Sequence, residues 1–246
     1  MRKIAFTNAK GGVAKTTTCV NIGAGLALAG YRTLLVDCDT QGQVSKSLGT
    51  QAGEGLAELM QGDAGLEDVQ IEARENLFVI AGGGALSGVK RLISRRDMRS
   101  ELVLSEALGD LRGYDFVLLD TATSWDVLNV NCLFYVEEIL IPVSMEVLAL
   151  QGVGDFLGRV NEVQRYREGP LIQGIIPTFY DGRVKKSAEI LEQLERHFPG
   201  VVWPAVRYNA RLSEAPGFGQ NIFEYAKKSN GAADYARLAE RLAKGG

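Results

Sequence analysis

Short, almost wholly apolar segments recur along the chain and alternate with longer segments in which apolar residues repeat with a helical period. The apolar segments are typical of buried strands and lie at 3–8, 33–37, 77–82, 115–120, 138–143, 171–178 and 201–206. The helix-period segments lie at 16–29, 84–95, 101–112, 147–167, 184–197 and 230–244. This alternation predicts an α/β fold, with a mostly parallel twisted sheet and helices on both faces. Because no linker interrupts the pattern, we expect a single domain spanning 1–246.

Composition narrows the function classes. The chain has 246 residues and a net charge of -3, which disfavours a wholly basic nucleic-acid binder but allows a local basic patch. Cys19, Cys38 and Cys132 lie far apart, so neither a disulfide framework nor a cysteine zinc site is expected. His197 is the only histidine, which nearly excludes chemistry that depends on this residue. Because neither a signal peptide nor an apolar run of about 20 residues occurs, we expect a cytoplasmic protein.

The first strand leads into the small-residue segment NAKGGVAKTTT at 8–18 and then into a helix. Strand, loop and helix in this order form a phosphate-binding loop, whose backbone N–H groups converge at a helix N-terminus. Lys15 would then contact the β- and γ-phosphates, and the Thr16 hydroxyl would hold Mg²⁺. The alternative is that lysine and threonines merely cap a solvated helix. Acidic residues in two later loops disfavour that alternative.

Those acidic residues follow two further apolar strands. Asp37 and Asp39 end one strand, and Asp120 ends the segment YDFVLLD. In parallel sheets ligands bind beyond the carboxyl ends of the strands, so the three side chains are expected near the loop. The alternative for the first two is that they are turn residues that cap a helix at 43–48.

The segment KGGVAKT at 10–16 resembles the deviant Walker A motif of the ParA/MinD group of P-loop ATPases, K-G-G-x-G-K-[ST], and departs from it at Ala14. TLLVDCDTQGQVSKSLG at 33–49 resembles the family's VLLVDxDPQGNxTxxLG. NARLSEAP at 209–216 resembles the ParA side of the group specifically. Together the matches span nearly the whole chain.

The resemblance implies an ATPase with ATP and Mg²⁺ as cofactors. It implies that Lys10 reaches the phosphates of ATP bound by a second subunit, so that ATP drives a homodimer, and that Asp39 orients the attacking water. With Lys15, these are the expected catalytic residues. The implied nucleotide contacts are Lys10, Gly11, Gly12, Val13, Ala14, Lys15, Thr16, Thr17, Arg207, Tyr208 and Asn209. The implied metal-site residues are Thr16, Asp37 and Asp120.

The chain also departs from the family pattern. Ala14 replaces a glycine; we expect it to be tolerated at negative φ, whereas a positive φ would add strain of about 1–3 kcal/mol. Ala122 and Thr123 replace prolines, so we expect a more mobile loop there. Arg207 and Tyr208 replace the family's Pro-Arg, which alters the expected contacts to the base.

The resemblance further implies a DNA-partitioning function. The ATP dimer would bind DNA without sequence preference, and a ParB-like partner would stimulate slow hydrolysis and release. The candidate DNA contacts are Arg183, Lys185, Lys186, Arg211, Lys227 and Lys228. The alternative for each of them is ordinary solvation of a helix face. Because the chain starts at its first strand, we expect no N-terminal helix-turn-helix and no operator binding.

Three other functions make different demands on the sequence. A ParA-like ATPase that positions a non-DNA cargo has the same motifs. A MinD-like membrane scaffold needs bulky apolar residues on a terminal amphipathic helix, which YARLAERLAKGG does not supply. An iron–sulfur relative needs paired cysteines, and Cys132 lies on a predicted helix well past Asp120. We therefore expect a nucleoid-associated protein that does not bind membranes.

Overall fold

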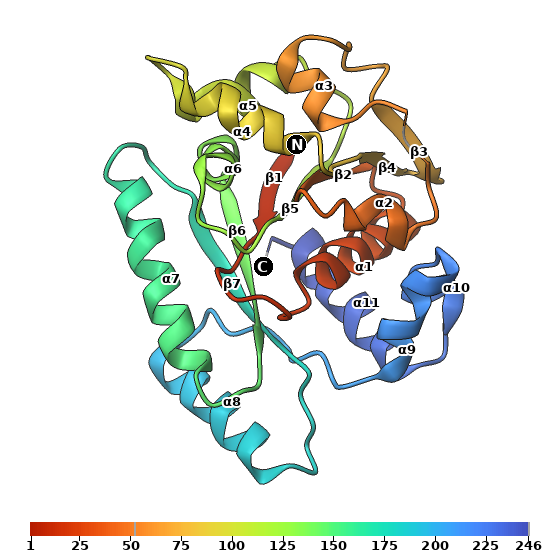
Figure 1. The fold of residues 1–246 in the computed structure, drawn as a ribbon. Helices are drawn as coiled ribbons and strands as arrows, with labels where there is room; N and C mark the ends of the chain where they lie inside the picture. Colours follow the sequence, from red (N-terminus) through yellow and green to blue (C-terminus); the bar gives the residue numbers. More distant parts are fainter. Residues whose placement is uncertain (52, 246) are drawn as a thin grey trace.

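The computed structural model describes residues 1–51 and 53–245. In this part of the chain seven strands form one sheet in the order β3-β4-β2-β5-β1-β6-β7 (Figure 1). The strands are β1 (Arg2–Phe6), β2 (Thr33–Cys38), β3 (Gln70–Arg74), β4 (Leu77–Ile80), β5 (Phe116–Thr121), β6 (Glu138–Ser144) and β7 (Leu171–Thr178). Neighbouring strands pair in parallel, except β3 with β4. The predicted mostly parallel α/β sheet is confirmed.

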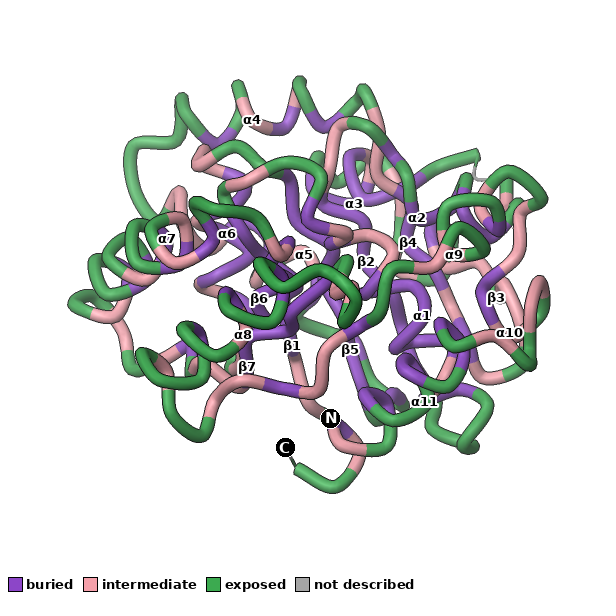
Figure 2. Tube along the Cα trace, turned by 90° about the horizontal axis from the view of Figure 1, so that it is seen from below, coloured by how far each residue is buried: buried purple, intermediate pink, exposed green. Residues whose placement is uncertain are grey.

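Helices cover both faces of the sheet. They are α1 (Lys15–Leu28), α2 (Gln43–Ser47), α3 (Leu56–Gln61), α4 (Leu86–Ser94), α5 (Val103–Ala107), α6 (Val127–Tyr135), α7 (Ala149–Gln164), α8 (Lys185–His197), α9 (Ala210–Glu214), α10 (Ile222–Tyr225) and α11 (Asn230–Ala243), with 3-10 turns η1 (Ser100–Leu102) and η2 (Ala215–Phe218). Ala5 and Val36 face a core shared with α3 to α8, whereas Ile4 and Leu35 face a core shared with α1 and α11. Buried backbone therefore runs through the centre of the molecule (Figure 2).

Two predicted elements differ in the structure. The segment 201–206 is no strand: only Val202 forms an isolated bridge, with Ile175. Pro204 follows closely and has no N–H to donate, which prevents a continuous ladder. The helix predicted at 101–112 is a 3-10 turn followed by α5, which ends at Ala107, shortly before Gly109.

The chain also contains elements that the apolar pattern did not predict. β3 is a half-exposed antiparallel edge strand, so its residues never form an apolar run. Its alternation of polar and apolar residues was the available signal. Helices α3, α9 and α10 are short, between four and six residues each, which leaves too few turns for a periodic pattern.

The sheet register brings the predicted acids together. β5 lies between β1 and β2, and Asp120 pairs with Phe6 on one side and with Asp37 on the other. All three strands run in the same direction, so their carboxyl ends meet at one edge. The loop between β1 and α1 begins at that edge.

Candidate functional site

The loop between β1 and α1 forms a nest of backbone N–H groups. Gly12 and Ala14 both have positive φ, at 72° and 62°, and Lys15 begins α1. Alternating left-handed residues turn successive N–H groups toward one side, and the α1 N-terminus adds its own unpaired groups. Val13 between them is buried, and its carbonyl accepts a hydrogen bond from Thr178 Oγ1 at 3.2 Å. The arrangement suits an anionic phosphate.

The Ala14 backbone is where expectation and structure differ. An alanine at this position would be free of backbone strain only at negative φ. In the structure Ala14 has φ 62° and ψ 36°. A left-handed alanine costs about 1–2 kcal/mol, because its Cβ crowds the following carbonyl. Position 14 therefore has a backbone conformation that suits glycine. Because alanine occupies it, the loop is strained.

The two lysines of the loop have different environments. Lys15 is only 7% exposed, and its Nζ donates to the Lys10 carbonyl at 3.1 Å. Burial lowers the pKa of Lys15, and the nearby Asp120 and Asp39 charges act in the opposite direction. The Lys10 side chain lies at the surface instead. It forms an ion pair with Glu146, which follows the end of β6. Lys15 thus belongs to the interior of the site and Lys10 to its surface.

Asp37 and Asp120 form a buried pair of carboxyl groups. Thr16 Oγ1 donates to Asp120 Oδ2 at 2.6 Å, whereas Asp120 Oδ1 is buried with no hydrogen-bond partner among the described residues. Burial, reinforced by the Asp37 charge, raises the pKa of Asp120 well above its usual value. Burial is also the main reason why the pKa of Asp37 rises to about 6.

This pair fits a divalent cation. A second buried carboxyl and an orphaned oxygen are unfavourable without a compensating positive charge. Residues 1–51 and 53–245 contain no group of three or more His, Cys, Asp or Glu side chains arranged for a metal. Mg²⁺ needs no such cage, since it is bound by one or two carboxylates together with substrate phosphates and water.

The loop after β2 has two roles. Asp37 accepts hydrogen bonds from the N–H groups of Asp39 and Val44, both at 3.0 Å, and so stabilises the start of α2. The alternative that Asp37 caps a helix is therefore correct for one of its two roles. Asp39 is half-exposed and accepts from the Gln41 N–H at 3.0 Å. Its carboxylate remains accessible at the edge of the site.

The loop after β5 is tied to three helices. Asp126 caps α6 through the N–H groups of Leu128 and Asn129 and forms an ion pair with Lys90 of α4 at 2.6 Å. Trp125 packs edge-on against Phe156 of α7. These contacts restrain the segment that was expected to be mobile for lack of prolines. The contacts with α4 and α7 join residues far apart in sequence, so no local pattern indicates them.

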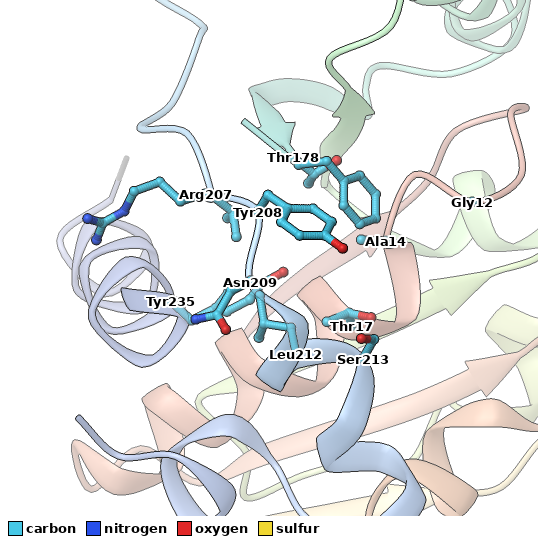
Figure 3. Close-up of a pocket in the computed structure, with 12 residues that line it drawn as sticks. Gly12, Ala14, Thr17, Thr178, Arg207, Tyr208, Asn209, Leu212, Ser213 and Tyr235 are labelled. Carbon is cyan, nitrogen blue, oxygen red and sulfur yellow. The ribbon is translucent and has the colours of Figure 1, made fainter. Parts of the chain in front are cut away.

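A cavity of about 390 Å³ adjoins the phosphate loop (Figure 3). Its lining comprises Gly12, Ala14, Thr17, Thr178, Phe179, Val206, Arg207, Tyr208, Asn209, Leu212, Ser213 and Tyr235. The predicted segment 207–209 therefore lies beside the predicted loop. The residues that sequence reasoning missed are chiefly Thr178, Phe179 and Leu212. The fold brings Thr178 and Phe179, at and just after the end of β7, to the same cavity as Leu212 of α9.

The Arg207 side chain does not point into this cavity. Its guanidinium group forms a two-pronged ion pair with Asp234 of α11, at 3.0 Å through Nε and 2.7 Å through Nη2. Figure 3 shows it extending away from the other lining side chains. Of the predicted contacts in this segment, Arg207 can offer only backbone to a ligand, whereas Tyr208 and Asn209 offer side chains.

The candidate DNA contacts form two groups on the surface. Arg183, Lys185 and Lys186 lie at the start of α8, whereas Arg211, Lys227 and Lys228 lie on and around α9 and α10 (Figure 1). All six side chains are exposed. Carboxylates neutralise some of them: Arg183 pairs with Asp181 at 2.7 Å and Arg211 with Glu214 at 2.9 Å.

Cys132 and His197, which the sequence offered for other chemistry, do not line the cavity beside the phosphate loop. Cys132 is fully buried in α6, so it presents no thiol for a cluster shared between subunits. His197 ends α8, with Nδ1 at 2.8 Å from the Gln193 carbonyl. No helix within residues 1–51 and 53–245 has the length and apolar character needed to cross a membrane.

Comparisons with known proteins show which chains this one resembles. An AAA-domain family model matches residues 1–172. The chromosome-partitioning ATPase Soj of Thermus thermophilus is 39% identical over 98% of this chain and 95% of its own length. The sporulation initiation inhibitor protein Soj of Bacillus subtilis is 36% identical over 99% of this chain and 98% of its own length.

Solved structures show the same fold. Cobyrinic acid a,c-diamide synthase from Mycobacterium smegmatis, solved with an ATP analogue and magnesium, is 31% identical, with a TM-score of 0.86 over 99% of this chain and 95% of that one. A plasmid partition protein from Borrelia burgdorferi bound to AMPPNP has a TM-score of 0.82 over 99% of this chain and 98% of that one; at 21% identity it supports the fold alone.

Proposed function

This chain belongs to the ParA family of P-loop ATPases, and from that premise we propose how its residues divide the work of a nucleotide-operated partitioning cycle. It is a ParA-type partitioning ATPase, with ATP and Mg²⁺ as cofactors. We propose that residues 1–246 form one P-loop ATPase domain.

The observation that carries the residue assignment is the hydrogen bond between Thr16 Oγ1 and Asp120 Oδ2, at 2.6 Å. It places a hydroxyl of the phosphate loop against a buried carboxyl whose other oxygen has no hydrogen-bond partner among residues 1–51 and 53–245. When bound, Mg²⁺ neutralises charge on the β- and γ-phosphates. Thr16 and Asp120 would hold the ion and its waters, and Asp37 would add a second negative charge beside it.

The remaining residues bind, orient and position. Lys15 and the backbone N–H groups from Gly11 to Thr17 hold the phosphates. Asp39, accessible at the site edge, orients the attacking water as a hydrogen-bond acceptor. Phosphoryl transfer depends mostly on positioning and charge stabilisation, so the site needs no histidine.

Lys10 is assigned to the partner subunit's nucleotide. Its side chain reaches away from its own loop toward Glu146, on the surface. In a dimer with ATP between the subunits, this ammonium group would exchange Glu146 for a phosphate of the facing site. ATP would therefore be required for a stable homodimer, and hydrolysis would weaken it.

We propose that the ATP dimer binds DNA without sequence preference through the two basic groups at α8 and α9–α10. A ParB-like partner would stimulate an otherwise slow hydrolysis, and the protein would reside with the nucleoid in the cytoplasm. The membrane-scaffold alternative has no support in α11, since Leu238 and Leu242 are buried against the rest of the core. A non-DNA cargo would use the same site and would differ in its partner.

DNA binding with different nucleotides tests the proposal. With Mg-ATP, binding to random-sequence duplex should be strong at 50 mM salt and should fall about 100-fold or more by 200 mM if four phosphates are contacted. Lys15→Ala should abolish nucleotide binding and, with it, DNA binding. Equal DNA affinity with ADP and ATP would contradict a nucleotide switch. A ParB-like coding sequence beside this one would identify the cargo class.

A further inference from the structure

The loop after β5 meets the phosphate loop at two points. Asp120, in the last turn of β5, accepts the hydrogen bond from Thr16 Oγ1 at 2.6 Å. Three residues later the Thr123 side chain lies over Gly11, because a Cβ added to Gly11 would stand 3.7 Å from Thr123 Cγ2. The two contacts lie at opposite ends of the segment 11–16. The loop after β5 therefore spans the phosphate nest and adjoins any anion held there.

Thr123 lies at the end of the nest that faces away from the neighbouring cavity. The phosphate loop contributes Gly12, Ala14 and Thr17 to the lining of that cavity. Neither Gly11 nor Thr123 belongs to the lining. A nucleotide that enters from the cavity and places its phosphates in the nest thus has its terminal phosphate toward Thr123.

The polar groups of Thr123 are free to bind a ligand. The residue is exposed, and within residues 1–51 and 53–245 neither its hydroxyl nor its N–H has a hydrogen-bond partner. The hydroxyl of the next residue differs, since Ser124 Oγ donates to Asp126 Oδ2 at 2.7 Å. Thr123 can therefore donate two hydrogen bonds to the oxygens of one phosphate group.

The chain on both sides of Thr123 is held in place by one buried side chain. Asn129 of α6 is 4% exposed. Its Nδ2 donates to the Ala122 carbonyl at 3.2 Å and to the Ser124 carbonyl at 2.9 Å. Donors that are fixed before the reaction stabilise developing charge without reorganisation. The loop thus presents Thr123 to the nest in a preorganised position.

These donors are particular to this chain. The family pattern has prolines at positions 122 and 123, where this chain has alanine and threonine. A proline has neither a backbone N–H nor a hydroxyl. Position 123 therefore carries two hydrogen-bond donors that the family pattern lacks.

We propose that Thr123 is a further catalytic residue, whose hydroxyl and N–H donate to the terminal phosphate of ATP. The inference rests on the proposed nucleotide site and adds a contact that ADP cannot make. In hydrolysis the water oxygen bonds to the terminal phosphorus, and the bond from that phosphorus to the bridging oxygen breaks. ADP leaves with the electron pair, and the water proton ends on the released phosphate. Thr123 gives up no proton, and its two donors stabilise negative charge on the transferred group.

The test compares the binding of Mg-AMPPNP, a non-hydrolysable ATP analogue, with that of Mg-ADP. Equilibrium dialysis measures both Kd values at a protein concentration below that at which sedimentation detects a dimer. Thr123→Val keeps the shape and the N–H, and should weaken AMPPNP binding by about tenfold, the size of one hydrogen bond to a charged group. Its Kd for ADP should stay within about twofold of the wild type, because ADP lacks the contacted group.

Two further substitutions at this position grade the effect. Thr123→Pro removes both donors and should weaken AMPPNP binding by about 100-fold, with ADP binding again retained. Thr123→Ser keeps both donors and should bind the two nucleotides like the wild type. In Thr123→Val, kcat/KM for ATP should fall by at least the factor lost in AMPPNP binding, since the contact is present in the transition state as well.

A matched control comes from the same loop. Ser124→Ala removes an exposed hydroxyl that is already bonded to Asp126, so it should leave the ratio of the two Kd values unchanged. Thermal melting of each variant checks that it is folded.

The outcomes separate the two proposals. Failure of the wild type to bind either nucleotide would overturn the nucleotide site itself. An unchanged ratio of Kd values in Thr123→Val would leave that site intact and refute the contact with the terminal phosphate. Parallel weakening of AMPPNP and ADP would show that Thr123 supports the loop as a whole, which also refutes the contact.

Discussion

The ammonium group of Lys10 lies 2.5 Å from Oε2 of Glu146 and so joins the phosphate loop to the segment after β6. The Lys10 charge lowers the pKa of Glu146, mainly through this hydrogen bond. Both side chains are substantially exposed. The lysine assigned to the partner's nucleotide is therefore restrained by an ion pair that can exchange.

Glu146→Gln should make ATP-dependent dimerisation easier, because Lys10 no longer has to leave a carboxylate. An exposed ion pair contributes little, so the dimer dissociation constant should fall about two- to fivefold. Analytical ultracentrifugation with Mg-ATP measures it. Glu192→Gln, which removes an exposed carboxylate on α8, is the matched control.

Lys10→Ala should retain ATP binding and lose the dimer. Sedimentation as a dimer in that variant would refute the sandwich assignment.

Ala14→Gly should stabilise the protein. The substitution removes about 1–2 kcal/mol of left-handed strain and adds about 0.5–1 kcal/mol of unfolded-state entropy. For a chain of this size the net gain corresponds to a rise in Tm of about 1–4 °C. Ala9→Gly, at an exposed position of the same loop outside the left-handed region, should give no such rise. Equal shifts in the two variants would mean that φ at position 14 is not the cause.

Asp39→Ala should trap the ATP dimer on DNA. Removing the carboxylate that orients water should lower kcat at least tenfold while ATP binding persists, since no contact of Asp39 is needed to hold Lys15 or Thr16. Steady-state ATPase assays and dissociation from immobilised DNA measure the two effects. Asp97→Ala changes an exposed aspartate in the loop after α4 and should leave both unchanged. Turnover at the wild-type rate in Asp39→Ala would exclude the water-orienting role.

Acidification should stabilise the Mg²⁺-free protein. The pKa of Asp37 is raised from 3.8 to about 6, and burial raises that of Asp120 as well. Between about pH 4 and 6 the folded state thus binds protons that the unfolded chain has lost, so stability decreases as pH rises through this window, by about 1–3 kcal/mol. In EDTA, Tm should fall from pH 5 to pH 7.5.

Asp120→Asn should flatten this dependence and abolish the extra stability that Mg-ADP confers at neutral pH. With Mg-ADP present, the wild-type dependence should reverse, since protons compete with the cation. A wild-type Tm that rises with pH in EDTA would contradict the raised pKa values.

The two basic groups should contribute unequally to DNA binding. Among the described residues Lys186, Lys227 and Lys228 form no salt bridge, whereas Arg183, Lys185 and Arg211 each have an acidic partner. In the double variant Lys227→Ala, Lys228→Ala, the slope of log K for DNA binding against log salt concentration should become shallower by about two. Each lost phosphate contact accounts for about one. Fluorescence anisotropy with ATP across a salt series measures it.

Arg211→Glu should weaken DNA binding and leave ATP-dependent dimerisation intact. Arg196→Ala, which removes an exposed charge at the far end of α8, is the control for both experiments. Unchanged salt dependence in the lysine double variant would assign DNA binding to another surface.

Much of the fold and the acidic half of the site could be predicted from local pattern. Apolar runs indicated six of the strands, and the acids at the ends of β2 and β5 meet because parallel neighbours end at one edge. The segment 201–206 was wrong as a strand, because apolar character does not reveal that Pro204 interrupts the ladder. β3 was missed because an edge strand needs no continuous apolar run.

By itself, then, the sequence determined the order of strand, loop and helix, which puts Lys15 and Thr16 in the phosphate loop and Asp120 at a strand end. Each of these placements depends on residues close together in the chain. Tertiary structure alone decided the left-handed backbone of Ala14, the turn of Arg207 toward Asp234, and the place of Phe179 on the cavity. Each depends on packing between segments that are distant in sequence. Local sequence patterns do not reveal such contacts, because the free energy of the whole fold determines which of them form.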